Sequence, residues 1–419
     1  MMIDKNKFKL LENEQKLDKE QTRQSLTYWH DVWRRLKKNH LAIVGLVCVV
    51  IIVLFATVGP LINPYKYNNQ YLDYKNVPPQ LTIYKLGDDI HVFLSEMNQL
   101  ILVSEDGHLL ETFSLAEADK DFVAKTYTYR LFNEEDVETA VVIVDFSYTT
   151  DPLKRDEGIR YSFTYEEVEY KTPIDKVWNK TFILGTDKNG RDMLARLMYG
   201  TGISLVIAFV AAFINFFIGV IYGSISGFFG KNTDIIMMRI VDIINSIPLL
   251  LYVILLMVVL KDSKFEIEVL NKIFGAGGLG TIIITLITVY WVGMARLVRA
   301  QVLSLKEQEY VLAAKTMGVS NFKIIQKHLI PNALGPIIVT LAMMIPTAVF
   351  TEAFLSFIGL GISAPRASLG SLANDGASFM QTYPYQLVIP AVTIAFMMLA
   401  FNFLGDGLRD ALDPRLRKG

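Results

Sequence analysis

The chain has 419 residues, of which 52% are hydrophobic and only 20% are charged, and its mean hydropathy is +0.34. This composition excludes an ordinary soluble enzyme and predicts a membrane protein with a soluble part. The 41 basic and 42 acidic residues nearly cancel, so the net charge gives no indication of a nucleic-acid partner. The single cysteine, Cys48, excludes an internal disulfide.

Residues 1–39 predict a cytoplasmic polar tail that ends in a helix at the membrane interface. Near its end four apolar residues recur at helical spacing: Trp29, Val32, Trp33 and Leu36. Basic side chains accompany them, at Arg34, Arg35, Lys37 and Lys38. This pattern favours a surface helix with tryptophans at headgroup depth and positive charge toward anionic lipid.

Six apolar segments are long enough to cross a hydrocarbon core, which needs about 20 helical residues. They are Leu41–Ile62 (a first helix within 40–62), Gly202–Phe228, Ile240–Leu260, Leu279–Val298, Leu334–Phe357 and Leu387–Leu404. Lysine and arginine gather before the first segment, after the fourth and after the sixth, which places these three regions in the cytoplasm. The predicted fold class is therefore an all-α polytopic membrane protein with six transmembrane helices and both termini inside.

Residues 63–182 predict a folded domain outside the cell, inserted between the first two transmembrane helices. Leu100–Val103 and Leu109–Phe113 flank Glu105-Asp106-Gly107, which is a hairpin signal. Further strands are indicated at Val141–Phe146 and by the alternating Tyr161, Phe163 and Tyr165. Leu115–Arg130 is expected to form a helix, so we expect an α+β domain.

Acidic runs in this domain, at Asn133–Glu138 and Tyr165–Glu169, have two interpretations. They form either a solvated face or a docking surface for an external binding protein. After the domain, Gly185–Asp192 predicts a turn. We expect a short interfacial helix around Met193–Met198 to follow it, before the second transmembrane helix.

A helix-forming, basic segment, EYVLAAKTMGVSNFKIIQKHLIPN, connects the fourth and fifth apolar segments. Good helix formers around Ala313 and Ala314 precede a break at Gly318, and a second helical pattern is expected to end at Pro331. His328 is expected at the C-terminal end of that helix, where it would complement the dipole rather than bind a metal. Helix, glycine bend, helix and proline would form a rigid projection able to push on a partner.

The sequence predicts no catalytic residue, metal or cofactor site. A phosphate-binding loop needs G-x-x-x-x-G-K-[ST], and the nearest approach, Gly230-Lys231, has Ile225 at the first glycine position and Asn232 at the hydroxyl position. The five histidines have no second ligand at metal-binding spacing.

Ionisable residues inside apolar segments cost about 2.5–3.5 kcal/mol each, so they are candidates for function. Arg239 and Asp242 lie three residues apart and are expected to pair. Glu352 is either a proton relay or an outer-gate or structural contact that water can reach. Pro248 and Pro346 are expected to kink helices that line the path of transport.

Five motifs resemble the dipeptide/oligopeptide branch of ABC-importer permeases, specifically its C-type subunits. They are GTDKNGRDMLARLMYGTGISL (Gly185–Leu205), MRIVDIINSIP (Met238–Pro248), ARLVRAQVLSLKEQEYV (Ala295–Val311), LSFIGLGISAP (Leu355–Pro365) and FNFLGDGLRDALDPRLR (Phe401–Arg417). The resemblance implies a permease core over residues 183–419 and a coupling loop over residues 300–332 that docks on a separate ATPase. It departs from the family at Leu312, where an acidic residue is usual and Glu309 could substitute, and at Leu369, where tryptophan is frequent.

The family implies that the coupling residues are Glu309, Ala313, Ala314, Gly318, His328 and Pro331. It also implies a second homologous permease subunit, two P-loop ATPases that carry ATP and Mg²⁺, and an extracellular substrate-binding lipoprotein. The expected function is peptide import across a bacterial plasma membrane, with a Gram-positive cell as the expected source and no catalysis by this chain. Nickel or glutathione import by the same family, a proton-driven carrier and a membrane receptor remain alternatives.

Overall fold

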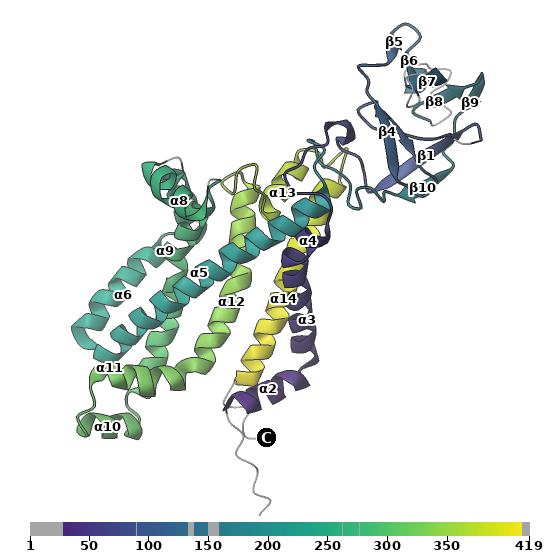
Figure 1. Ribbon diagram of the computed structural model, residues 1–419. Helices are drawn as coiled ribbons and strands as arrows, with labels where there is room; N and C mark the ends of the chain where they lie inside the picture. Colours follow the sequence, from purple (N-terminus) through teal and green to yellow (C-terminus); the bar gives the residue numbers. More distant parts are fainter. Residues whose placement is uncertain are drawn as a thin grey trace, which may run out of the picture.

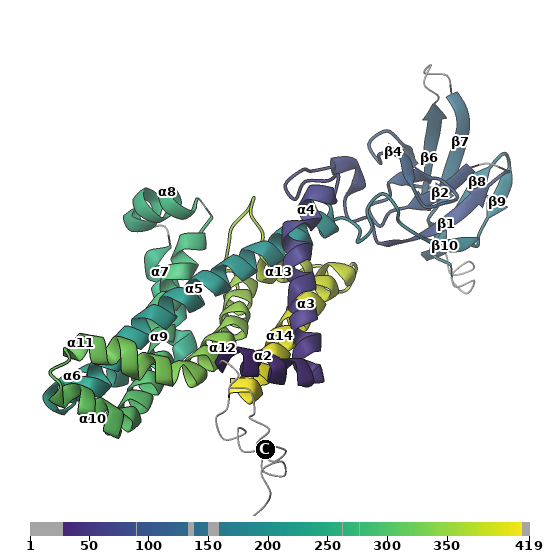
Figure 2. The ribbon, with the colours of Figure 1, turned by 60° about the horizontal axis from the view of Figure 1, so that its bottom comes forward.

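The computed structural model describes residues 28–412, except 89, 133–137, 150–158, 262 and 276. The described chain forms a group of long helices and, beyond one end of them, a domain of β-strands (Figures 1 and 2). The strands lie between the first and second long helices in the sequence, in the region of the predicted insertion.

Helices α2 (Tyr28–Lys38) and α3 (His40–Thr57) pack on the last helix of the chain, α14 (Tyr385–Leu412). The short α4 (Gly59–Ile62) follows α3 and contacts it. Val32 and Leu36 of α2 are buried against Ala411 and Leu412. The predicted surface helix is therefore present, but these two apolar residues face protein rather than lipid.

The centre of the helical part is the pair α5 (Met193–Phe229) and α9 (Leu279–Leu305), which cross closely because of a stripe of glycines. A Cβ atom at Gly223 would lie 2.4 Å from the carbonyl oxygen of Ala295, and Gly219 and Gly227 leave similarly little room. Small residues four apart let helix backbones approach in this way. Helix α5 is continuous from Met193, so the prediction of a separate interfacial helix before Gly202 is wrong.

The third predicted transmembrane helix is broken. Helices α6 (Lys231–Ser246) and α7 (Leu249–Leu260) meet at an angle of 85°, with Pro248 at the start of α7. Proline cannot supply a helical amide and disfavours helix at the residue before it. By length and hydropathy the described chain contains five helices that could cross a membrane, or six if this bent pair counts as one.

The remaining helices complete the core of the helical part. They are α8 (Asn271–Phe274), α10 (Glu309–Thr316), α11 (Asn321–Ile324), α12 (Ile330–Phe357) and α13 (Leu369–Ala377). A π-helical turn over Ile325–Leu329 joins α11 to α12, and one helical span runs from Asn321 to Phe357. The prediction that the second helix of the loop ends at Pro331 is therefore wrong: Pro331 lies just after the π-helical turn, in the first turn of α12.

The strand domain consists of two five-stranded antiparallel sheets. The first has the order β10 (Asp175–Trp178), β1 (Gln80–Leu86), β2 (Ile90–Leu94), β3 (Leu100–Val103), β4 (Leu109–Phe113). The second has the order β5 (Asp119–Asp121), β6 (Thr126–Phe132), β7 (Glu138–Asp145), β8 (Ser162–Tyr165), β9 (Val168–Tyr170). Side chains from both sheets, such as Leu86 and Phe163, share one buried cluster.

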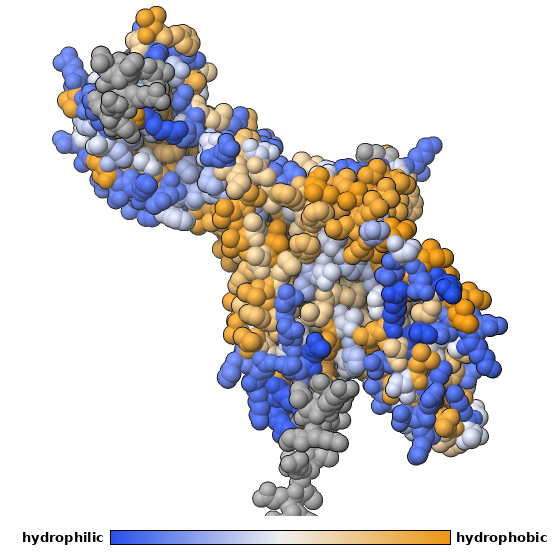
Figure 3. Space-filling model, turned by 180° about the vertical axis from the view of Figure 1, so that it is seen from behind, coloured by the Kyte–Doolittle hydropathy of each residue, from blue (hydrophilic) through white to orange (hydrophobic). Residues whose placement is uncertain are grey.

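The structure confirms the hairpin of β3 and β4 and the strands at β7 and β8. It contradicts the predicted helix at Leu115–Arg130, because this region forms β5 and most of β6. The acidic run at Asn133–Glu138 lies mostly outside the described residues. Apolar side chains dominate much of the helical surface in Figure 3, and polar ones gather over the strand domain and the opposite end.

Candidate functional site

The loop between α9 and α12 forms a compact projection on the end of the bundle farthest from the strand domain (Figure 1). Val311 and Ala314 of α10 and Ile324 at the end of α11 are buried in a cluster with Val298 and Val302 of α9. The ammonium of Lys315 lies 5.1 Å from the centre of the Phe228 ring at the end of α5. The projection is therefore packed on the ends of two long helices rather than suspended from them.

Four large apolar side chains of this projection are exposed, among polar ones. We call these four residues the loop surface: Tyr310, Leu312, Met317 and Phe322. The Met317 and Phe322 side chains are 74% and 72% exposed. Large apolar side chains exposed on a packed projection are typical of an interaction site, and these four were not among the site residues predicted from the sequence.

The predicted coupling residues have different positions in this geometry. Glu309 and Ala313 are exposed on α10, whereas Ala314 is buried within the chain's own core. Of the two alanines, therefore, only Ala313 is placed to contact a partner, because Ala314 packs inside the chain. Gly318 has φ +79°, and no atom lies within 4 Å of the point that a Cβ would occupy there. A side chain at Gly318 would therefore strain the backbone without a clash.

His328 and Pro331 lie inside the continuous span that begins at Asn321. His328 is half-buried, its ring centre is 6.4 Å from that of Tyr310, and its carbonyl accepts a hydrogen bond from Asn332. It is therefore not at a helix C-terminus, contrary to the sequence prediction. Within the described ranges, no group of three His, Cys, Asp or Glu residues is placed to hold a metal.

An ion-pair cluster at the base of the projection was not predicted. Arg299 of α9 donates to both carboxylate oxygens of Asp234 in α6, at 2.5 and 2.6 Å, and Ser226 of α5 donates to the same carboxylate. Lys306 Nζ donates to the carbonyl of Gly227 at 3.0 Å. A bidentate arginine pair fixes orientation as well as distance, so these contacts join α5, α6 and α9 just above the loop.

The candidates in the bent third segment are arranged differently from the prediction. Asp242 pairs with Arg296 of α9 at 2.8 Å rather than with Arg239, which is exposed on the same helix. This ion pair therefore connects α6 to α9. Pro248 stands at the break between α6 and α7, whereas α12 continues through Pro346.

Glu352 lies in a cluster of serines that joins three helices. Its side chain has no solvent exposure, and its two oxygens accept hydrogen bonds at 2.7 Å from Ser204 of α5 and Ser356 of α12. Ser368, which caps α13, is 3.2 Å from the Ser356 hydroxyl. The prediction of a carboxylate that water can reach is therefore wrong, and the contacts are those of a structural junction.

The GTDKNGRD turn forms a second polar junction at the same end of the bundle. Asp187 accepts hydrogen bonds from Arg191 at 2.7 Å and from Arg196, and Arg196 also approaches Asp375 of α13. Asp192 caps α5 by accepting from the Ala195 amide. Burial raises the pKa of Asp192 above its ordinary value. The motif therefore ties the end of the strand domain to α5 and α13.

Comparisons with known proteins assign this architecture. Residues 219–418 match the family described as the binding-protein-dependent transport system inner membrane component, and residues 27–79 match the N-terminal TM domain of oligopeptide transport permease C. The oligopeptide transport system permease protein OppC of Bacillus subtilis (strain 168) is 49% identical over 58% of this chain and 75% of the relative. The dipeptide transport system permease protein DppC of the same organism is 36% identical over 94% and 88%.

The chain belongs to the oligopeptide/dipeptide permease family of ABC importers. The family consists of transport permeases rather than enzymes. An alignment over 94% of this permease has to include most of the strand domain, so the domain has a counterpart in the dipeptide relative. A chain of the MetNI methionine ABC transporter, in an inward-facing structure, covers 53% of this permease and 98% of itself at 24% identity. Its TM-score of 0.40 is too low to add to the assignment.

Proposed function

We propose that this permease forms half of the translocation pathway of a peptide importer and receives its energy from an ATPase that docks on the loop surface. The observation that carries the proposal is the combination of a packed base, with Ala314 and Ile324 buried, and the exposed apolar side chains of the loop surface, above all Met317 and Phe322. Aromatic and methionine side chains are enriched where proteins bind each other. Glu309, exposed beside the loop surface, is the proposed substitute for the acidic residue that Leu312 replaces.

The proposed partners are a second, homologous permease subunit, two P-loop ATPases that carry ATP and Mg²⁺, and an extracellular substrate-binding lipoprotein. Helices α3, α6 and α7 support the permease partner, because they expose apolar side chains along much of their length, including Val47, Ile243 and Leu255. Lipid and a partner helix could share these faces. No cofactor or nucleic acid is proposed for this chain.

The proposed location is the plasma membrane of a bacterium, a Gram-positive one in our proposal, with both termini and the loop surface in the cytoplasm and the strand domain outside. We propose the domain bounds that the sequence predicts: 1–39, 40–62, 63–182 and 183–419. Peptides are the proposed cargo because the relatives' names specify oligopeptide and dipeptide transport. These names favour peptides over nickel or glutathione as the cargo. Membership of the permease family leaves the two other hypotheses, a proton-driven carrier and a membrane receptor, without support.

The test is to replace the apolar loop surface with charge. Met317→Asp and Phe322→Asp should each weaken co-purification of the ATPases about tenfold or more, the effect of losing a buried interface residue. Substrate-stimulated ATP hydrolysis should fall with it, while membrane insertion stays normal. Gln326→Asp, which adds the same charge on the exposed part of the following segment, serves as the control. Wild-type ATPase binding and hydrolysis in both Met317→Asp and Phe322→Asp would refute the proposed docking site.

A further inference from the structure

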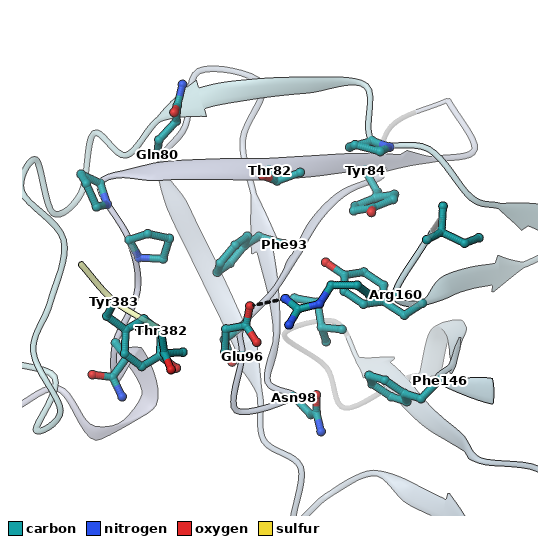
Figure 4. Close-up of a pocket in the computed structure, with 18 of the residues that line it drawn as sticks. Gln80, Thr82, Tyr84, Phe93, Glu96, Asn98, Phe146, Arg160, Thr382 and Tyr383 are labelled. Carbon is teal, nitrogen blue, oxygen red and sulfur yellow. Dashed lines mark hydrogen bonds and ion pairs between the residues drawn. The ribbon is translucent and has the colours of Figure 1, made fainter. Parts of the chain in front are cut away.

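A cavity of about 790 Å³ lies between the strand domain and the segment that leads into α14 (Figure 4). Its walls are β1, the end of β2 and the segments around residues 160 and 172, and Thr382–Tyr385 close it from the helical part. Tyr385 donates a hydrogen bond to the carbonyl of Thr186 at 2.6 Å, which fixes this wall to the base of the domain. The volume lies in the range of about 300–1,000 Å³ that is usual for ligand sites.

Strands β1 and β2 separate at this cavity. Their ladder pairs only Tyr84–Leu86 with Ile90–Val92. On its other side β1 pairs with β10 over Gln80–Ile83. Among the described strands, none pairs with Gln80–Ile83 on the side of β2. The first half of β1 is thus an open edge inside a sheet.

The main-chain groups of this edge point into the gap. The carbonyls of Pro79 and Ile83 accept hydrogen bonds from residues that flank β10. Because main-chain groups alternate in direction along a strand, those of Gln80 and Thr82 point the opposite way, toward β2. Both residues line the cavity.

The facing edge of β2 is open in the same way. The amide of Ser95 donates to the carbonyl of Gln99 within the β2–β3 hairpin, so the main-chain groups of Leu94 point away from β3 and toward β1. An extended segment that enters the gap could bond to either edge, as in strand addition to a sheet. Hydrogen bonds to the main chain of a ligand depend little on its side chains. They therefore suit a ligand class, such as peptides, whose members have many different sequences.

Opposite charges stand at the mouth of the cavity. Arg160 and Glu96 form an ion pair at 2.7 Å, and Figure 4 shows both side chains facing the cavity below Thr82 and Tyr84. Burial and then the negative charge of Glu96 raise the pKa of Tyr383 on the opposite wall. A free peptide carries one ammonium, which Glu96 can bind, and one carboxylate, which Arg160 can bind. A loop of a folded protein has no free terminus, so these two charges favour a free peptide over a loop of a partner protein.

Aromatic rings supply the apolar part of the wall. The Tyr161 ring centre is 5.7 Å from that of Tyr84 and 6.1 Å from that of Phe146, and Phe93 projects from β2 (Figure 4). Such rings contact diverse side chains through area rather than through directed bonds. The open strand edges, the Glu96–Arg160 pair and the aromatic rings therefore all line the same cavity.

We propose that this cavity binds a short peptide in extended conformation, held by the open edges of β1 and β2 and, at its charged ends, by Glu96 and Arg160. The ends of an extended tetrapeptide lie about 13 Å apart, so the exposed side chains of Glu96 and Arg160 swing apart and exchange their mutual contact for the ammonium and the carboxylate of the peptide. The site lies outside the helices, on the wall formed by Thr382–Tyr385, where cargo can be held before it enters the pathway. The inference rests on the proposed peptide cargo.

The primary experiment measures equilibrium binding of radiolabelled tetra-alanine to the full permease–ATPase complex in lipid nanodiscs, with the binding protein omitted. We expect saturable binding that N-acetyl-tetra-alanine amide, which lacks both charges, displaces about tenfold or more weakly, because each bond to a charged group contributes strongly. Equal competition by the capped peptide would overturn the assignment of the charged ends.

Variants separate the charges from the main chain. Glu96→Gln and Arg160→Gln should each weaken tetra-alanine binding about tenfold or more, whereas Arg130→Gln, which breaks a similar exposed ion pair with Asp119 in the same domain, should not. Gln80→Pro removes one main-chain donor at the first residue of β1, a position that tolerates proline. It should weaken binding severalfold, and Gln80→Ala, which keeps that donor, should leave binding unchanged.

A final measurement separates this inference from the proposed function. ATP-dependent tetra-alanine uptake by proteoliposomes with the binding protein tests the function. Uptake without any tetra-alanine binding to the complex alone would overturn the cavity site and leave the importer intact. Absence of both would overturn the peptide cargo as well. If tetra-alanine does not bind and Glu96→Gln instead weakens docking of the binding protein, the cavity is a protein contact and our proposal is wrong.

Discussion

Glu352 is a carboxylate without solvent exposure whose hydrogen-bond donors are serine hydroxyls. A buried charge costs several kcal/mol unless it is neutralised or well paired, and two short hydrogen bonds on opposite oxygens offset part of that cost. Because those bonds come from Ser204 on α5 and Ser356 on α12, the side chain links two helices. A proton relay would instead need a path to water, which complete burial withholds in this conformation.

We expect Glu352→Gln to keep the junction, since an amide occupies the same volume and serine hydroxyls can both donate and accept. Peptide uptake by this variant should stay ATP-driven and should persist when an uncoupler collapses the proton gradient at constant ATP. Glu352→Ala should lower stability by about 1–3 kcal/mol through the lost hydrogen bonds, seen as a lower thermal midpoint. Folded Glu352→Gln protein without any uptake would support the relay instead.

The ion-pair partners of single residues could not all be predicted from the sequence. The sequence predicts that Asp242 pairs with Arg239 because they share a helix face, yet its partner is Arg296, on the next helix. Likewise Asp234 and Arg299 are 65 positions apart in the sequence. Spacing can predict neighbours within a helix, but contacts between helices depend on how the helices cross, and one sequence does not specify that.

At the scale of elements, close packing of α5 and α9 depends on glycine. A Cβ atom at Gly223 would meet the Ala295 carbonyl, part of a backbone that cannot move without shifting α9. Gly293 on α9, in contrast, has no atom within 4 Å of a Cβ position. The two sites offer a matched comparison within one pair of helices.

We expect Gly223→Ala to destabilise the permease by about 1–3 kcal/mol, the usual cost of overpacking. Gly293→Ala should be neutral or stabilise it by up to about 1 kcal/mol, because alanine favours helix. Thermal unfolding of the purified protein compares the two variants. A smaller loss for Gly223→Ala than for Gly293→Ala would contradict the close crossing of α5 and α9.

Elements that depend on a local sequence pattern were predicted correctly, whereas elements that depend on tertiary pairing or packing were not. The β3–β4 hairpin follows from the chemistry of its turn around Gly107, which has φ +91°. Leu115–Arg130 begins with good helix formers, but the alternating Thr126–Phe132 pairs with β7 along its whole length, and tertiary pairing overrides helix propensity. Pro248 indicated a kink in the third transmembrane helix, but its angle depends on packing that the sequence does not reveal.

At the scale of the whole molecule, the loop surface and the strand domain lie at opposite ends of the helices (Figures 1 and 2). The chain order of long helices was predictable because each helix has its own apolar run. The open edge of β1 was not predictable, because it arises where two neighbouring strands diverge. With the proposed membrane crossing, the two ends face different compartments.

We expect Leu110→Cys, on an exposed position of β4, to react with a membrane-impermeant maleimide on intact cells. Lys323→Cys, on α11, should react only after the cells are permeabilised. Both variants carry Cys48→Ser, so that the added thiol is the only one. Labelling of Lys323→Cys on intact cells would reverse the orientation inferred from the charges.

The continuous helix from Asn321 to Phe357 has a mechanical consequence. It first runs along the end of the bundle and then turns to follow the other long helices (Figures 1 and 2), with Phe322 of the loop surface in the first arm and Glu352 in the second. Helical structure continues through the bend, so the two arms form a crank rather than two hinged pieces. A push on the loop surface would thus reach the far end of the bundle as a rotation of the second arm.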